Sequence, residues 1–384
     1  MIYNDKYFGL SPFIARWKSD TPLENWLSLK ADRSDFWKSV YVLYYQITDN
    51  KYYKGGLNYI EKAVRPLYGL GNVDKTTFKD MVYCLHRFGI SFEDYCLYGF
   101  KDNSSLAYRD SFVADKLRYH YCDILNTPAV RPLMEDKYAC YRKFCKFFKR
   151  DMAGCYSVED WNIFAEFVSR HSTFIYKPLN EHSGHGITIL ESEDINQEEF
   201  FASKIKNGPF VLEELIVQGK ETAMMHPESI NSCRVVTFNL QGKIHILGVT
   251  WRVGTGKAIK DNAGSGGIYA AVNPETGVVE TDARNYRGNI FEFHPDTNLK
   301  FKGYHLPEWS SAKSFINDMA LNQEGATLIS WDIAYSCKGW LMVEANDNGD
   351  WSIIQSNMRE GKKKLLYSLM DKYFNSNSGT IKNK

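Results

Sequence analysis

The stretch from residue 328 to residue 346, LISWDIAYSCKGWLMVEAN, constrains the fold most strongly. It contains two apolar runs, Leu328–Tyr335 and Trp340–Val343, that are rich in β-branched and aromatic residues. A small polar break at residues 336–339 separates the runs. Short runs of this composition on either side of a turn predict a β-hairpin.

The hairpin carries oxygen ligands. Asp332 interrupts the first run, and Glu344 and Asn346 end the second, two residues apart. Strand alternation puts Glu344 and Asn346 on one face, and pairing of the strands would bring Asp332 alongside them. Two carboxylates this close repel unless a cation or proton lies between them, and such a ligand set suits Mg²⁺ holding phosphates. The alternative is an ordinary strand Asp and an exposed Glu-Ala-Asn turn.

Length and charge limit the class of protein. A chain of 384 residues can bury a large core and form two or three lobes. Lys+Arg 47 against Asp+Glu 46 leaves a net charge of +1, which does not favour nucleic acid or an anionic membrane. Eight cysteines without a CxxC pair, and an N-terminus without an apolar signal, indicate reduced thiols in a cytoplasmic protein. No apolar run approaches the roughly 20 residues of a membrane span, although a peripheral membrane contact stays open.

The first 125 residues are predicted to be mostly helical and rich in aromatic residues, because apolar positions recur every three or four residues. Breaks are expected at Gly55–Gly56, at Gly69–Gly71 and at residues 102–105. No catalytic motif is found there. The region is interpreted as a packing region, with a substrate-recognition cap as the alternative, and the polar tail at residues 375–384 is expected to fray.

Basic residues recur where an anion could bind. Residues 134–150 predict an amphipathic helix whose basic face is mostly solvated, and Lys137 follows Asp136 near a helix start. Lys177 lies within a short apolar strand, FIYKP, where an amine is costly unless it points into a charged cleft. The following loop, NEHSGHG at residues 180–186, suits either a phosphate-covering flap or an ordinary hairpin.

The middle of the chain is predicted to be sheet. Residues 210–217 form a strand with two adjacent glutamates, and residues 229–240 and 243–253 form neighbouring strands around Gln241-Gly242. Arg234 and Arg252 lie within apolar strands, so each should pair with a carboxylate or a phosphate. The Gly-rich loop DNAGSGG at residues 261–267 suits close approach to a ligand or a plain surface loop. Helices are expected at residues 310–321 and 358–374.

The order of these features resembles the ATP-grasp superfamily, over about residues 130–372. Within it, four motifs are similar to the sugar-transfer-associated ATP-grasp proteins of bacterial polysaccharide clusters. They are Glu-Glu-Leu-Ile-x-Gln at 213–218, Ser-Ile-Asn-x-x-Arg-Val-Val-Thr at 229–237, the loop at 261–267, and His294-Pro295. The resemblance implies an α+β fold in which two lobes with antiparallel sheets hold ATP between them. The expected divisions are 1–125, helical; 126–212, N-lobe; 213–374, C-lobe; and 375–384, tail. No separate α/β domain precedes the lobes.

The resemblance also implies roles for individual residues. Lys137 and Lys177 would neutralise the α- and β-phosphates of ATP, and the flap would close over them. The flap residues are Ser183, Gly184, His185 and Gly186. The hinge backbone that meets adenine would be Glu213, Glu214, Leu215 and Ile216. Glu221 would meet the ribose hydroxyls, with Glu214 or Gln218 as alternatives.

On the metal and acceptor side, Asp332, Glu344 and Asn346 would bind one or two Mg²⁺ ions. Arg234, with Arg252, would face the transferring phosphoryl group. The residues that would line the acceptor are Asn231, Asp261, Asn262, Gly266, Gly267 and His294.

The chemistry implied is ligation through an acyl phosphate, with a small-molecule carboxylate and an amine or sugar-linked acceptor as partners. Such a reaction depends on positioning and charge neutralisation, so the lack of a Ser/His or Cys/His arrangement does not count against an enzyme. Two alternatives stay open: a sugar or small-molecule kinase, and a nucleotide-sensing partner of glycosyltransferases without turnover.

Overall fold

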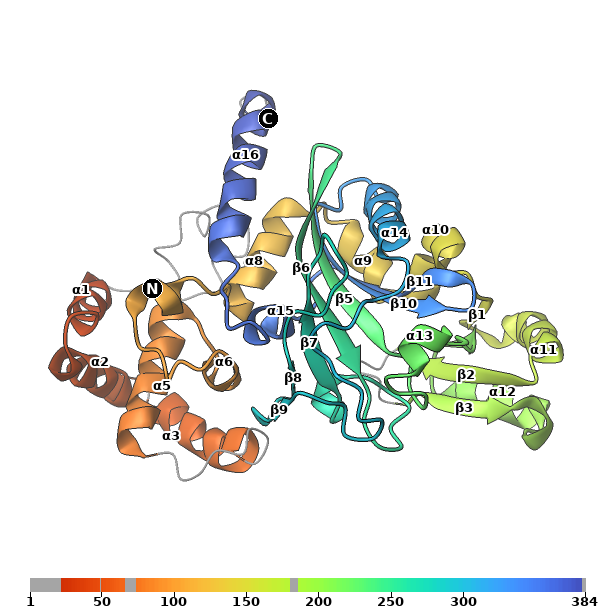
Figure 1. Cartoon of the computed structure of the whole chain (residues 1–384), viewed down its shortest axis with the longest axis horizontal. Coiled ribbons are helices and arrows are strands. Elements are labelled where there is room, and N and C mark those ends of the chain that lie inside the picture. The colour runs from red at the N-terminus through yellow and green to blue at the C-terminus, as the bar shows by residue number, and fades with distance from the viewer. Residues whose placement is uncertain (1–21, 49, 66–73, 180–185, 382–384) are drawn as a thin grey trace.

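The computed structural model describes residues 22–48, 50–65, 74–179 and 186–381, which form a helical region and two antiparallel sheets (Figure 1). The seven-stranded sheet lies between the N-terminal helices and the four-stranded sheet. This arrangement confirms the predicted α+β class with a helical N-terminal region. Among the described residues, no helix is long and apolar enough to span a membrane.

The N-terminal region is helical, as predicted. Its elements are α1 Pro22–Ala31, α2 Asp35–Thr48, α3 Asn50–Tyr59, the π-helix η4 Ile60–Val64, α5 Lys75–Phe88, α6 Phe92–Leu97, α7 Leu106–Asp110 and α8 Asp115–Leu125. Asp74 caps α5, and Gly89 ends it with a φ of 74°, a left-handed conformation that glycine adopts without steric cost. The predicted break at Gly55–Gly56 is wrong, because α3 continues through both glycines. The predicted break at residues 102–105 is confirmed, whereas Gly69–Gly71 lies outside the described residues.

The smaller sheet has the strand order β1-β4-β2-β3. Its strands are β1 Met152–Cys155, β2 Thr173–Pro178, β3 Thr188–Glu191 and β4 Phe210–Glu214. The preceding and covering helices are α9 Val130–Glu135, α10 Lys137–Phe148, α11 Trp161–Arg170 and α12 Gln197–Lys206, with short 3₁₀ turns at Val158–Asp160 and Ser192–Asp194. An aromatic cluster that includes Phe164, Phe201 and Phe210 forms its core. Because β4 ends at Glu214, the first residues of the predicted C-lobe belong to this sheet.

The larger sheet has the order β11-β10-β5-β6-β7-β8-β9. Its strands are β5 Ser232–Leu240, β6 Lys243–Val253, β7 Ile268–Val272, β8 Ala283–Arg284, β9 Ile290–Phe291, β10 Leu328–Ser336 and β11 Gly339–Asn346. The remaining elements are α13 Lys220–Ala223, the 3₁₀ turn Ala263–Ser265, α14 Trp309–Leu321, α15 Ser352–Ser356 and α16 Lys363–Ile381. The predicted hairpins β5–β6 and β10–β11 are therefore confirmed.

The two faces of the larger sheet join different cores. On one face, Val235 and Trp331 belong to a cluster that includes Phe144 of α10 and Ile316 of α14. On the other face, Val236, Phe238 and Leu328 share a cluster with α15, α16 and the N-terminal helices. The N-terminal region therefore completes the core of the larger sheet, which agrees with its interpretation as a packing region.

The helix limits near the C-terminus differ from the predictions. Helix α14 begins at Trp309 and is preceded by Glu308 with a φ of 45°, and no serine side chain caps it. The predicted helix at 358–374 is displaced, because α15 ends at Ser356 and α16 runs from Lys363 to Ile381. Helix α16 thus continues into residues that the sequence predicted to be a frayed tail.

Candidate functional site

A row of charged residues crosses three strands of the larger sheet. Asp332 of β10 pairs in register with Glu344 of β11 on one side and with Arg234 of β5 on the other. Directly paired residues of antiparallel strands point to the same face, so these three side chains are neighbours. The register shifts after Asp332, where Ile333 pairs with Met342, so Val343 is the extra residue of a β-bulge. The predicted juxtaposition of Asp332 and Glu344 is confirmed.

Asp332 is buried between two arginines. Its Oδ1 accepts from Arg234 Nε at 2.5 Å, and its Oδ2 lies 3.0 Å from Arg252 Nη2. Burial works to raise the pKa of the Asp332 carboxyl, but the charges of Arg234 and Arg252 outweigh this effect and hold the pKa below its usual value. The expectation that each strand arginine pairs with a carboxylate or a phosphate is therefore met by one shared carboxylate.

Glu344 is open to solvent, unlike Asp332. Although the side chain reaches solvent, protein surrounds it on its other sides. This desolvation is the main cause that raises the pKa of Glu344, and the charge of Asp332 adds to it. Lys177, Arg234 and Lys137 act in the opposite direction on the same carboxylate. Residues from both lobes, widely separated in the sequence, therefore act on one carboxylate.

The hairpin residues fit a hard cation. Asn346, which pairs with Ser330 next to the charged row, has a buried Nδ2 with no hydrogen-bond partner among the described residues. Turning the amide by 180° would put its carbonyl oxygen at that position. No cluster of three or more His, Cys, Asp and Glu side chains that could hold a metal occurs in the described residues, so a metal here would use the Asn346 amide or phosphate oxygens beside two carboxylates.

Lys177 is anchored by a buried carboxylate. Its Nζ lies 2.8 Å from Glu213 Oε1, and Arg150 Nη2 lies 2.9 Å from Oε2 of the same side chain. Burial works to raise the pKa of Glu213, but Lys177 and Arg150 bring it down to about 2. The sequence assigned Arg150 to a solvated face, and this is wrong: the residue lies beyond the end of α10 and is buried.

The linker between the two sheets offers free backbone groups. No hydrogen bond to a described residue occupies the N–H or C=O groups of Leu215 and Ile216, which follow β4. The side chain of Glu214 accepts from the backbone N–H of Asp151 at 2.8 Å and lies 3.0 Å from Lys338 Nζ. Glu221 is exposed on α13, and its backbone carbonyl accepts from the Tyr304 hydroxyl. The contacts of the hinge with adenine and of Glu221 with ribose stay predictions.

The phosphate side is described in part. Lys137 is the first residue of α10, where Asp136 accepts from the N–H groups of Tyr138 and Ala139 as the N-cap. Of the predicted flap, Ser183, Gly184 and His185 lie outside the described residues. Gly186 lies just before β3 and is exposed. Its φ of 69° is in the left-handed region, which glycine adopts without steric cost.

On the predicted acceptor side, Asp261 is tied to the charged row. Its Oδ2 accepts from the Ser232 N–H at 2.8 Å and from the Ser232 hydroxyl, whose oxygen accepts from Arg252 Nη2 at 2.6 Å. Burial raises the pKa of Asp261, although Arg252 and Ser232 oppose this. Asp261 therefore orients Arg252 through Ser232.

The loop after Asp261 is tightly folded. Asn262 caps the short 3₁₀ turn by accepting from Gly264 N–H, and the Gly266 carbonyl accepts from the Thr255 hydroxyl at 3.1 Å. A Cβ on Gly267 would lie 2.2 Å from the Asp261 carbonyl oxygen. Glycine at position 267 thus allows the backbone to pass directly beside Asp261.

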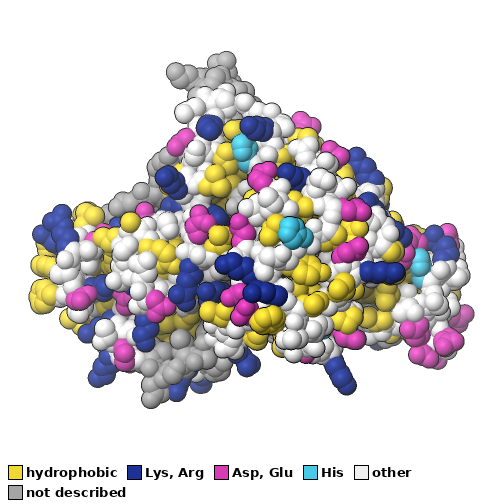
Figure 2. Space-filling model, viewed as in Figure 1, with side chains coloured by type: hydrophobic (Ala, Val, Ile, Leu, Met, Phe, Trp, Pro, Cys, Tyr) yellow, Lys and Arg dark blue, Asp and Glu magenta, His cyan; other side chains and the backbone are white. Residues whose placement is uncertain are grey.

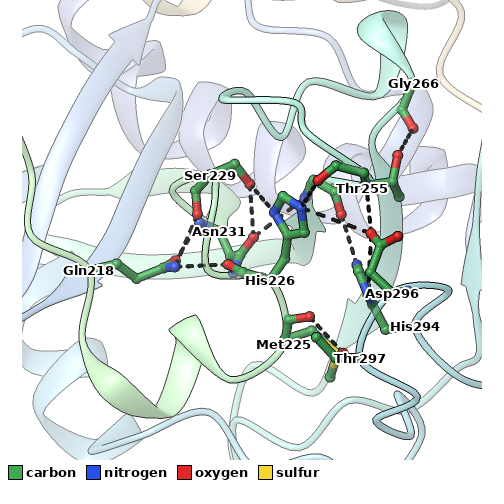
Figure 3. Close-up of polar contacts among 12 residues, drawn as sticks. Gln218, Met225, His226, Ser229, Asn231, Thr255, Gly266, His294, Asp296 and Thr297 are labelled. Atoms are coloured by element: carbon green, nitrogen blue, oxygen red, sulfur yellow. Dashed lines mark hydrogen bonds and ion pairs between the residues drawn. The ribbon is translucent and has the colours of Figure 1, made fainter.

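Two of the predicted acceptor residues are buried and bonded to the protein itself. Asn231 donates to the carbonyls of Thr222 and His226, and its own N–H donates to Gln218 Oε1 (Figure 3). His294 Nε2 lies 2.8 Å from the Gly254 carbonyl oxygen, and His226 Nε2 lies 2.9 Å from that of Gly256 (Figure 3). In this conformation Asn231 and His294 hold the loop after β6 in place. His226 shares this role, and no sequence pattern indicated it.

Comparisons with known proteins place these observations in a family context. A family model described as sugar-transfer associated ATP-grasp matches residues 116–369. No curated protein gives a match.

Solved structures with a similar fold include D-alanyl-alanine synthetase A from Vibrio cholerae O1 biovar eltor, with a TM-score of 0.39, 10% identity and 67% of each chain covered. D-alanine–D-alanine ligase from Bacillus anthracis complexed with ATP has a TM-score of 0.39 and 12% identity, over 65% of this chain and 69% of that one. Phosphoribosylamine–glycine ligase from Thermotoga maritima has a TM-score of 0.42 and 11% identity, over 67% of this chain and 59% of that one.

Proposed function

Because the chain belongs to the sugar-transfer associated ATP-grasp family, we propose that it is an ATP-dependent, Mg²⁺-dependent ligase that joins a carboxylate to an amine or sugar-linked acceptor. The observation that carries the proposal is the in-register row of Glu344, Asp332 and Arg234. Lys177 and Lys137 act on the same row from the other lobe. Carboxylates beside lysines and arginines are what a polyphosphate with its metal requires.

In the proposed site, Asp332, Glu344 and Asn346 hold Mg²⁺, which when bound would neutralise the β- and γ-phosphates. Lys177 acts electrostatically on Glu344 and is held by Glu213, so it can meet a phosphate without first becoming ordered. The free backbone groups of Leu215 and Ile216 can pair with the adenine edge. The flap at residues 183–186 and Glu221 keep their predicted nucleotide contacts within this proposal.

The proposed reaction has two steps. A carboxylate oxygen attacks the γ-phosphorus, the bond to the β–γ bridging oxygen breaks, and ADP leaves behind an acyl phosphate. The amine then attacks the acyl carbon, the C–O bond to phosphate breaks, and the amine loses a proton. Arg234 and Arg252 both bind the Asp332 carboxylate. They can stabilise the charge on the transferring group, since each need only exchange an Asp332 oxygen for a phosphate oxygen.

The acceptor side is proposed to be the loop at residues 261–267. Asp261 orients Arg252, and Asn262, Gly266 and Gly267 shape the backbone there. Asn231 and His294 contribute by holding the loop after β6, whose Thr255 hydroxyl donates to the Gly266 carbonyl. The family description supports a sugar-related acceptor, and on that basis we assign the protein to polysaccharide biosynthesis in the cytoplasm, without a nucleic-acid partner. The divisions at residues 125, 212 and 374 stay part of this proposal.

The test is ATP turnover against a panel of carboxylates and amino sugars, scored by ADP release and product mass. We expect Mg²⁺-dependent turnover that Asp332→Asn lowers by about 100-fold or more, as expected when a transition-state charge is left unbalanced. Asp318→Asn, at an exposed position on α14, is the matched control and should turn over like the wild type. Equal turnover in D332N and wild type would contradict the metal assignment.

Hydroxylamine distinguishes the ligase from the two alternatives. An acyl phosphate reacts with hydroxylamine to give a hydroxamate, whereas a kinase gives a stable phosphorylated product and no hydroxamate. Tight nucleotide binding without ADP release across the panel would instead indicate a nucleotide-sensing partner protein.

A further inference from the structure

A second row of residues extends from the candidate site toward the N-terminal helices. Arg252 of β6 pairs in register with Tyr269 of β7, and Tyr269 pairs with Arg284 of β8. Directly paired residues point to one face, so Arg284 lies on the same face as Arg252. Two strand spacings separate the two arginine backbones, which is roughly 10 Å.

Arg284 has no counter-ion among the described residues. Its side chain is half-buried, and it forms no ion pair or hydrogen bond with any residue in the described part of the chain. Burial lowers the pKa of Arg284, and the like charge of Arg359 lowers it further, while Tyr269 and Asp282 act in the opposite direction. A half-buried guanidinium is costly without a partner, so this position favours an anion.

Arg359 is connected to the β7–β8 strand pair through α15. Its N–H donates to the Ser356 carbonyl at 3.2 Å, and the Ser356 hydroxyl lies 3.1 Å from the hydroxyl of Tyr269, the register partner of Arg284. Arg359 follows α15 with a φ of 50°, and its guanidinium lies on Gly99, where a Cβ would come within 2.6 Å of Cζ. Nη1 donates to Asp102 at 3.0 Å, but the buried Nε has no hydrogen-bond partner among the described residues. The charges of Arg284 and Arg359 both act to lower the pKa of Tyr108 against burial, which raises it, and this agrees with their placement near one another.

We propose that Arg284 and Arg359 bind an anionic group of the acceptor, a phosphate or a carboxylate distinct from the reacting group. Two guanidinium groups with free donors can hold such a group in bidentate fashion, and it would cancel their mutual repulsion. Lys and Arg side chains gather on this face where the N-terminal helices meet the larger sheet (Figure 2). The N-terminal region contributes to this site only by positioning Arg359, through Gly99 and Asp102. The acceptor identity rests on the proposed ligase function, whereas the anion site does not.

The test is calorimetric titration of the full chain, saturated with a non-hydrolysable ATP analogue and Mg²⁺, with inorganic phosphate and separately with acetate. We expect binding by the wild type that Arg284→Gln and Arg359→Gln each weaken about tenfold or more, which corresponds to about 1.4 kcal/mol. Arg284→Lys keeps the charge but loses the bidentate geometry, so its affinity for the anion should lie between that of the wild type and that of Arg284→Gln. Arg287→Gln, at an exposed position on the same β8–β9 turn, should bind like the wild type.

The outcomes separate the two proposals. A preference for phosphate or for acetate identifies the anionic group. Absence of binding by the wild type, or equal binding by R284Q and the wild type, would overturn the anion site. If the wild type does not bind the ATP analogue, the ligase proposal fails, and the phosphate titration of the same nucleotide-free protein still tests Arg284.

Discussion

Arg150 Nη1 donates to the carbonyl oxygen of Met342 at 2.6 Å and thereby joins the two sheets. Nη2 of the same side chain reaches the carbonyl of Val343 at 3.2 Å and the Glu213 carboxylate at 2.9 Å. Val343 is the bulged residue that precedes Glu344, and β11 is an edge strand. The Arg150 guanidinium therefore donates to two carbonyls of the edge strand at the bulge and to the carboxylate that holds Lys177.

Removing this guanidinium should destabilise the protein strongly. Arg150→Met leaves Glu213 with one partner and two carbonyls without a donor, so we expect a loss of about 3–5 kcal/mol in the free energy of unfolding. Arg170→Met removes an arginine that pairs with Asp151 at the surface, and should cost less than about 1 kcal/mol. Urea denaturation measures both, and similar losses would contradict the linking role of Arg150.

Neutralising Glu344 should stabilise the nucleotide-free protein above neutral pH. A folded-state pKa raised above the unfolded value contributes stability that is fully present below the unfolded pKa and is lost as pH rises through the folded pKa. Glu344→Gln keeps the neutral form, so its melting temperature should exceed that of the wild type at pH 8 and match it near pH 4. Thermal melts across this range measure the difference, with Glu198→Gln on α12 as an exposed control. The same E344Q variant should bind Mg²⁺-nucleotide at least about tenfold more weakly.

A methyl group at position 267 should displace Asp261. In Gly267→Ala the new Cβ would meet the Asp261 carbonyl oxygen at 2.2 Å, so the loop must move and Arg252 loses its orientation. Gly264→Ala, in the same loop, meets only Asn262 Oδ1 at 3.4 Å. We expect the KM for the acceptor to rise about tenfold in G267A with the KM for ATP unchanged, and neither to change in G264A. A higher KM for ATP alone would place the loop on the nucleotide side.

Truncating His294 should reduce stability. His294→Ala leaves the Gly254 carbonyl and the Asp296 N–H without their partner, which costs about 1–3 kcal/mol when such groups are buried. His305→Ala, at an exposed position, should change the free energy of unfolding by less than about 0.5 kcal/mol. If H294A retains full stability but loses acceptor turnover, His294 contacts the acceptor directly.

The hairpin at residues 328–346 was predictable because its evidence is local. A strand has a period of two, so the sequence predicts that the paired strands bring Asp332 alongside Glu344, and the structure confirms that the two are neighbours. The β-bulge was not predicted, and without it the pairing of Ile333 with Met342 would continue to set Asp332 opposite Val343. Arg150 could not be predicted in the same way. Its partners lie 63 and 192 residues further along the chain, and basic neighbours in the sequence made it look like part of a solvated face.

Other errors arose where tertiary packing overrode local preference. Glycine at 55 and 56 disfavours a helix, yet α3 continues through both residues. The burial of Asn231 and His294 depends on His226 and on the loop after β6, neither of which carries a sequence pattern. Arg284 and Arg359 are connected through the tertiary contact between Tyr269, the register partner of Arg284, and Ser356 of α15.

The core that joins the helical region to the larger sheet has a consequence for the chain as a whole. Residues from α1 to α8 and from α15 and α16 contribute to one apolar cluster with β5 and β10. The two ends of the chain therefore share one hydrophobic core. A protein cut near residue 125 would leave both pieces with an open apolar face and no independent reason to fold. The helical region is therefore not an interchangeable module: it should be inherited with the sheet and should unfold with it in a single cooperative transition.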